Sequence, residues 1–207
     1  MSEPHTDEPM LGPRYLDGFV LASEVHGRQL RKGSNTPCLA HLMGVSALVL
    51  EHGGDEDCAI AGLLHDAIED SDDGNQMSAL IAARFGERVR GIVWACSDAV
   101  GARGVQKPEW HRRKREYIAH LETVDADALL VSACDKIHNA RAIVADLRVL
   151  GEGLWQRFST RSGEDQVWYY TSLADVFSRR MPGPLADELQ RVVDEMGVLE
   201  RAGRERA

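Results

Sequence analysis

Long apolar runs are missing from this sequence of 207 residues. No stretch reaches the roughly 18 consecutive apolar residues that indicate a transmembrane helix. The first thirteen residues are acidic and polar, and they contain no apolar core of the kind that a secretory signal needs. We therefore expect a cytoplasmic protein whose chain begins with a flexible acidic tail at residues 1–13.

Cysteine and basic residues are also scarce. The four cysteines include no C-x-x-C pair, so their spacing predicts neither a zinc ribbon nor a disulfide framework but buried free thiols. Lys and Arg number 24 against 33 Asp and Glu, which gives a net charge of −9. Binding to a nucleic acid polymer needs a basic face, so we exclude that class of partner. A small anionic substrate stays compatible, because a metal ion and a few local cations can reverse the potential inside one cleft.

The alternation of apolar and polar residues that marks β-strands is absent, and apolar residues recur at helical spacing. Asp55 is the expected N-cap of a helix that ends at residue 70. Other helices are expected from residue 15 onward and at 38–52, 77–84, 87–97, 109–121, 126–150, 164–180 and 185–199. We predict a single all-α domain over residues 14–199, with a flexible surface loop at 97–108 and a polar tail at 200–207.

Ionisable side chains gather where the predicted helix ends, in the stretch His65-Asp66-Ala67-Ile68-Glu69-Asp70. His65 and Glu69 are i,i+4 neighbours, as are Asp66 and Asp70, so a continuous helix places all four on adjoining rows of one face. An apolar helix does not normally present such groups inward unless they are paired or hold a metal. The alternative is a solvated helix end, which is common for a lone His-Asp dipeptide.

Two further polar residues interrupt apolar helices. Asp135 follows an apolar run, and Asn139 lies one turn later on the same face. His41 lies in a helix that otherwise reads as buried, where a lone histidine is more often a core residue. Taken with His65 and Asp66, these residues offer two imidazoles and two carboxylates, a donor set suited to manganese, iron or zinc. The sequence therefore predicts a divalent metal site.

These motifs resemble, in order and approximate spacing, those of the HD-domain metal-dependent phosphohydrolases. The resemblance is closer to the hydrolase domain of RelA/SpoT proteins and to the single-domain small alarmone hydrolases, and it extends over roughly residues 14–180. It implies an HD-type helical bundle. The matching segments are Arg31-Lys32-Gly33 followed by Pro37 and His41, the stretch from His65 to Asp70, and Asp135-Lys136-Ile137-His138-Asn139-Ala140-Arg141.

The resemblance also implies a role for each matching residue and a reaction. The metal, usually Mn²⁺, would be held by His41, His65, Asp66 and Asp135. Glu69 and Asp70 would orient and deprotonate the attacking water, Arg31 and Lys32 would line the base pocket, and Asn139 would contact the nucleoside. The implied reaction removes the 3′-pyrophosphate from guanosine tetra- or pentaphosphate and leaves GDP or GTP.

Departures from the family pattern leave other functions open. Cys38 stands where the family often has an aromatic residue, and Leu42 stands where it often has proline. An adenosine alarmone or NADPH is therefore an alternative substrate, and a non-catalytic nucleotide-binding module is a third hypothesis.

The basic run His111 to Arg115 reads as a solvated helix face or as a phosphate contact. We expect His138 to make a structural hydrogen bond and the aromatic run Trp168 to Tyr170 to pack mainly in the core.

Overall fold

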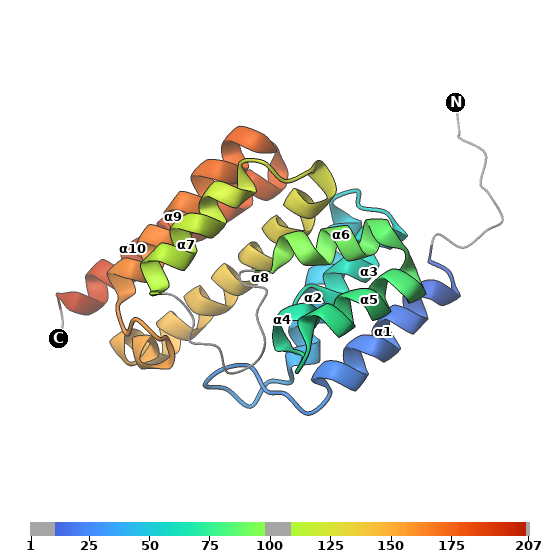
Figure 1. Cartoon of the computed structure of the whole chain (residues 1–207). Helices are drawn as coiled ribbons and strands as arrows, with labels where there is room; N and C mark the ends of the chain where they lie inside the picture. Colours follow the sequence, from blue (N-terminus) through green and yellow to red (C-terminus); the bar gives the residue numbers. More distant parts are fainter. Residues whose placement is uncertain (1–10, 98–108, 206–207) are drawn as a thin grey trace.

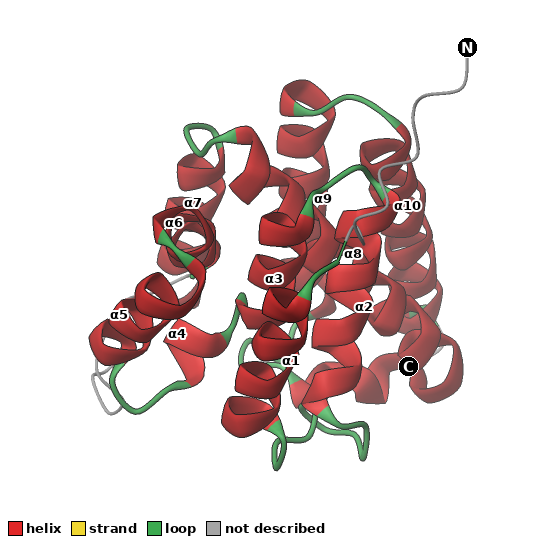
Figure 2. Ribbon diagram, turned by 90° about the vertical axis from the view of Figure 1, so that its right-hand side faces the viewer, coloured by secondary structure: helices red, strands yellow, loops and turns green. Residues whose placement is uncertain are grey.

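The structure, a computed structural model, describes residues 11–97 and 109–205. The expected all-α fold is confirmed: within these ranges the chain forms helices and no strand, apart from an isolated bridge between Leu30 and Pro37 (Figure 2). The elements are α1 (Pro13–His26), α2 (Cys38–Glu51), α3 (Glu56–Leu64), α4 (Ala67–Asp70), α5 (Gly74–Phe85), α6 (Glu87–Cys96), α7 (Trp110–Leu121), α8 (Ala126–Leu150), the 3₁₀ turn η1 (Gly151–Arg157), α9 (Gly163–Arg180) and α10 (Pro184–Arg204).

Helix α8 joins the two halves of the bundle. It contacts α2, α3 and α6 on one side and α9 and α10 on the other, and Figure 1 shows it running between these groups. Its buried residues recur at helical spacing along almost its whole length, as in a helix that packs on both sides. The side chain of Asp125 accepts from the amide of Ala128 and so caps its first turn. A polar residue of α8 whose side chain points towards α2 and α3 therefore lies where the two halves of the bundle meet.

Helices α2 and α3 pack close together because Gly62 of α3 faces α2. A Cβ atom on Gly62 would lie 3.1 Å from the Cα of Ser46 and 3.3 Å from its amide nitrogen. The hydroxyl of Ser46 also donates to the carbonyl of Ala59 across the same contact, at 2.9 Å. This close approach brings His41 on α2 towards His65 at the end of α3.

The prediction of one continuous helix that ends at residue 70 is wrong. Helix α3 begins after its expected N-cap Asp55 but ends at Leu64, and a separate short helix, α4, follows His65 and Asp66. The physical reason lies at Gly62, whose carbonyl would accept from the amide of Asp66 in a continuous helix. Nδ1 of His65 donates to that carbonyl instead, at 2.8 Å.

The end of the chain also differs in detail from the expectation. Helix α10 continues to Arg204, where the sequence predicted a polar tail from residue 200, because Glu200 is buried and pairs with Arg204 at 2.9 Å. Most of the predicted acidic tail and of the predicted loop at 97–108 lies outside the described residues. The cysteines are free, as predicted, but only Cys58 and Cys134 are buried. None of the described helices is both long enough and apolar enough to cross a bilayer.

The contact between α2 and α3 generates a stability prediction. Gly62→Ala should lower the free energy of unfolding by about 1 kcal/mol, because the added methyl group overpacks the backbone of Ser46. Gly91→Ala in α6 is the matched control, since a Cβ there meets nothing within 4 Å, and it should raise stability by about 0.5–1 kcal/mol. Urea unfolding with chelator present measures both variants. A Gly62→Ala protein at least as stable as the parent would contradict the close-packing argument.

Candidate metal centre

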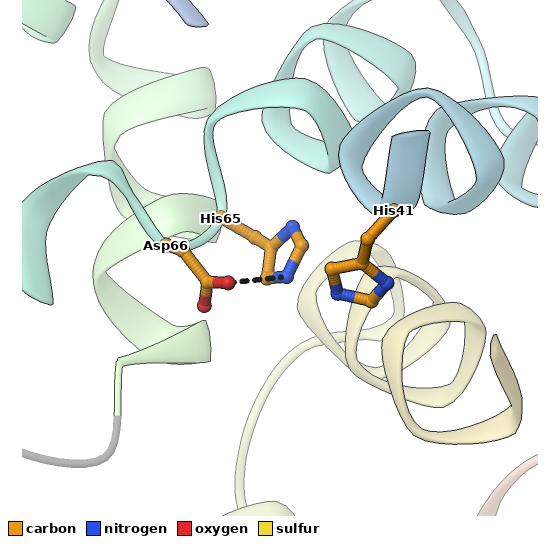
Figure 3. A group of neighbouring side chains, drawn as sticks. All are labelled: His41, His65 and Asp66. Atoms are coloured by element: carbon orange, nitrogen blue, oxygen red, sulfur yellow. Dashed lines mark ion pairs between the residues drawn. The ribbon is translucent and has the colours of Figure 1, made fainter. Parts of the chain in front are cut away.

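Three of the four predicted metal ligands meet where α2, α3 and α4 come together. The donor atoms of His41, His65 and Asp66 all lie within 4.8 Å of one another. Figure 3 shows the carboxylate of Asp66 and the ring of His41 on opposite sides of the His65 ring. Both histidines are buried, so the rings meet away from bulk solvent.

Asp135 brings the fourth predicted group from α8. Its Oδ1 atom lies 3.1 Å from Nε2 of His41 and 3.6 Å from Nε2 of His65, so one carboxylate oxygen faces both rings. The other oxygen, Oδ2, pairs with the ammonium of Lys136 at 2.6 Å. Lys136 is the neighbour of Asp135 in the chain, but its charge-pairing role was not predicted from the sequence.

The orientation of His65 leaves one nitrogen aimed at the centre. Because a carbonyl can only accept, the bond to Gly62 keeps a proton on Nδ1, so Nε2 is the nitrogen that offers a lone pair when the ring is neutral. Nε2 is buried and makes no hydrogen bond with any described residue. Its nearest charged neighbours are Oδ2 of Asp66 at 3.4 Å and Oδ1 of Asp135 at 3.6 Å. A buried lone pair beside two carboxylates fits a divalent cation.

The ring of His41 is held from behind by His138. Their Nδ1 atoms lie 2.9 Å apart, which confirms the hydrogen bond expected of His138. When His41 Nε2 is the metal-facing atom, Nδ1 carries the proton and donates it to His138, the arrangement that usually fixes a ligand histidine. Gly44 makes room for this ring, since a Cβ there would lie 2.3 Å from Nε2 of His138. Sequence reasoning missed this role of Gly44, because no local pattern links it to a residue on α8.

The charges of the cluster shift its pKa values in opposite directions. Burial lowers the pKa of His41, and burial with the charge of His41 lowers that of His138 to about 4. Burial also acts to lower the pKa of His65, but the carboxylates of Asp66 and Asp135 outweigh it and hold that pKa well above its ordinary value. The pKa of Asp66 is lowered to about 2, because the charge of His65 outweighs the effect of burial. In the absence of a cation, a proton on His65 balances the carboxylates.

The predicted substrate residues connect to the same centre. Arg31 donates to Oδ1 of Asn139 at 2.7 Å, and Asn139 donates through Nδ2 to Oδ1 of Asp135 at 2.5 Å. Arg31, Lys32 and Asn139 line a cavity of about 350 Å³. The hydrogen bonds thus form a continuous path from the loop after α1 to the predicted metal ligand.

The two predicted water-activating residues lie on α4, directly after Asp66. The amide of Asp70 donates to the carbonyl of Asp66 at 2.9 Å, so α4 is anchored on a predicted ligand. Oδ2 of Asp70 lies 3.7 Å from Nδ1 of the buried His26. Both carboxylates are partly exposed, as groups that exchange protons with water must be.

One residue of the basic run reaches the cavity. Lys114 lines it and holds its ammonium 4.7 Å from the centre of the Tyr169 ring. Tyr169 and Tyr170 are buried and also line the cavity, whereas Trp168 is exposed. The expected core packing of this aromatic run is therefore confirmed for the two tyrosines.

The raised pKa of His65 generates a prediction for metal binding. Because the pKa of His65 is raised well above its ordinary value of 6.5, a cation must displace a proton from this ring. Mn²⁺ affinity should therefore increase as the pH rises through the raised pKa and should be weaker at lower pH. Calorimetric titration of Mn²⁺ in buffers of different ionisation enthalpy should show proton release that declines as the pH increases. An affinity that stays constant from pH 6 to 9 would contradict the assignment of His65 as a ligand.

Comparison with known proteins agrees with this geometry. A family model described as HD domain matches residues 18–164. The chain is 35% identical over 129 residues to guanosine-3′,5′-bis(diphosphate) 3′-pyrophosphohydrolase MESH1 of Xenopus tropicalis, covering 61% of this chain and 67% of that protein. It is 31% identical over 128 residues to a probable enzyme of the same name from Synechocystis, covering 61% of this chain but only 16% of that longer protein.

A solved structure shares the fold at low sequence identity. It is described as a metazoan SpoT ortholog that hydrolyses ppGpp, and it superposes with a TM-score of 0.72 at 22% identity. The superposition covers 93% of this chain and 99% of the other. The convergent histidines and aspartates, the all-α bundle and the family match over most of the chain agree: the chain belongs to the HD-domain family.

Proposed function

We propose that the protein is a metal-dependent phosphohydrolase that removes the 3′-pyrophosphate from guanosine tetra- or pentaphosphate. The observation that carries the proposal is the buried Nε2 of His65, which makes no hydrogen bond with a described residue and faces Asp66 and Asp135 beside a cavity lined with cations. The named activity of the Xenopus relative supports this choice of substrate.

The proposed metal ligands are His41, His65, Asp66 and Asp135, and the proposed ion is Mn²⁺. When bound, the ion supplies Lewis acidity to a phosphoryl oxygen and to the attacking water. Hydrogen bonds from the second ring nitrogens of both histidines hold the ligands in place before any ion arrives. The chain therefore has little to reorganise when it binds the metal.

The carboxylates of α4 are the proposed proton acceptors. Glu69 and Asp70 follow Asp66 within one turn, so they can orient a water molecule beside the ion and take its proton. Water that has lost its proton is the nucleophile that the hydrolysis of a phosphate ester requires.

The cations of the cavity are suited to the phosphates and to the base. Lys114 and Lys136 line the cavity and can neutralise the charge of the pyrophosphate. Arg31 and Lys32 are the proposed base contacts, and Asn139 is the proposed nucleoside contact. A net charge of −9 on the whole chain does not oppose this, because the potential within a cleft depends on its own lining.

Replacing either proton acceptor tests the reaction. Glu69→Gln and Asp70→Asn should each lower kcat by about 100-fold or more while leaving Mn²⁺ affinity within about threefold, because they lose the base and keep the ligands. Glu87→Gln on the surface of α6 is the matched control and should retain full activity. Pyrophosphate release from guanosine tetraphosphate, with Mn²⁺ and then with chelator, measures the rates.

The same assay separates the proposed substrate from its alternatives. Guanosine tetraphosphate, its adenosine counterpart and NADPH are offered to the Mn²⁺-loaded protein under identical conditions. We expect the guanosine compound to give the highest kcat/KM. No metal-dependent release of phosphate or pyrophosphate from any of them would defeat the assignment as an enzyme.

A further inference from the structure

The cavity beside the metal centre extends along one face of α8. Asp135, Asn139, Ala142 and Asp146 are spaced at i, i+4, i+7 and i+11, so they share this face. Asp146 lies seven residues beyond Asn139, about 10 Å along the helix axis. A nucleotide with its 3′-phosphates at the metal centre and its nucleoside at Asn139 therefore points its base towards Asp146.

A single ion pair holds Asp146 in place at this end of the cavity. Nη1 of Arg157, in the turn η1, donates to Oδ2 of Asp146 at 2.8 Å. No other described residue makes a hydrogen bond or ion pair with this carboxylate, so Oδ1 is available to a ligand. The side chain of Asp146 is 47% exposed, whereas that of Arg157 is 26% exposed.

Arg157 is in turn held against the loop that carries Arg31 and Lys32. Gly33 has φ +72, and a Cβ there would lie 2.4 Å from Cδ of Arg157. Only glycine allows both this backbone conformation and this approach. Arg157 therefore contacts both the loop that carries Arg31 and Lys32 and the carboxylate of Asp146.

The charge of Asp146 is unexpected in a cavity for a polyanion. It is the sole carboxylate among the described residues that line the cavity, and the cations there include Arg31, Lys32, Lys114 and Lys136. A carboxylate near phosphate groups would weaken binding, since like charges repel. Arg157 offsets part of this charge, and the available Oδ1 favours a ligand group that offers hydrogen-bond donors.

Guanine and adenine differ in what they present to such a carboxylate. The Watson–Crick edge of guanine carries N1–H beside the N2 amino group, two adjacent donors that can meet the available Oδ1 and the second lone pair of Oδ2. Adenine presents an N6 amino group beside N1, which is an acceptor and faces the carboxylate with a lone pair. A carboxylate at this edge favours the first pattern over the second, because adenine N1 would bring a lone pair against a negatively charged oxygen.

We propose that Asp146 reads the donor edge of guanine and makes this cavity select guanine over adenine. Arg157 is the positioning residue that orients the carboxylate. This inference rests on the proposed function, because it assumes that a purine nucleotide occupies the cavity with its phosphates at the metal centre.

Binding of nucleoside diphosphates tests the proposal without requiring hydrolysis. Calorimetry on the Mn²⁺-loaded full chain gives Kd for GDP, IDP and ADP, where inosine keeps N1–H but lacks the amino group. We expect GDP to bind about tenfold or more tighter than ADP, with IDP between them. In Asp146→Asn the ratio of ADP to GDP dissociation constants should fall to within about threefold, chiefly because GDP affinity is lost.

The matched control is Glu195→Gln. Glu195 of α10 pairs with Arg148 of α8 but does not line the cavity, so this variant should keep the parent ratio. A purely structural role of Asp146 would change the affinities of both nucleotides together, so the ratio separates the two roles. Asp146→Ala, checked for folding by its thermal midpoint, should give the same low ratio as Asp146→Asn.

An unchanged ratio in both Asp146 variants, a parent protein that does not prefer GDP to ADP, or no measurable binding of GDP would overturn the proposal. Failure of the proposed function is recognised separately. It would appear as absence of pyrophosphate release from guanosine tetraphosphate, even if the preference for GDP persists and depends on Asp146.

Discussion

The hydrogen bond from Nδ1 of His65 to the carbonyl of Gly62 is the contact on which the metal centre depends. The last carbonyls of a helix lack intrahelical donors, and buried ones need a partner. Because His65 supplies that partner from its own side chain, α3 ends at Leu64 and the chain turns before α4 begins. The same bond fixes the tautomer of the ring and aims Nε2 at the carboxylates. One interaction thus ends a helix, orients a proposed metal ligand and positions Asp66.

The charges around this ring are balanced by residues of α8. A buried carboxylate is costly unless it is paired, and both oxygens of Asp135 have partners: Lys136 at Oδ2, and Asn139 with the two imidazoles at Oδ1. Removal of one partner would leave a buried charge uncompensated. The cluster therefore combines a site for a cation with a charge arrangement that is tolerable when only protons are present.

Helix α8 connects the proposed metal centre at one end of the cavity with the proposed base-recognition site at the other. Helix α8 has 25 residues, and the helical spacing of Asp135, Asn139 and Asp146 places them on one face. In the proposed arrangement Asp135 lies at the phosphate end of the nucleotide and Asp146 at its base. The loop with Arg31 closes the same cavity through its bond to Asn139 and the contact of Gly33 with Arg157.

The sequence by itself determined the helical class and most element positions, and it pointed to the candidate metal-donor residues. Apolar periodicity and N-cap chemistry are local properties, so the ranges of α2, α8 and α9 could be predicted within a residue or two, as could Asp55 as a cap. Inward polar residues in apolar helices pointed to His41, His65 and Asp135, because burial without a partner is unfavourable. The prediction of one helix that continues to residue 70 relied on the same local pattern. It failed because the side chain of His65 takes the carbonyl of Gly62 that the next helical amide would have used.

Only the tertiary structure decided how these donors are supported and what faces them. His41 and His138 are 97 residues apart in the chain, Arg31 and Asn139 are 108 apart, and Gly33 meets Arg157 across the cavity. Such contacts depend on how α2, α3 and α8 pack, and no periodicity within a single segment encodes that packing. The roles of Gly44, Lys136 and the Asp146–Arg157 pair became visible for this reason only once the helices were assembled.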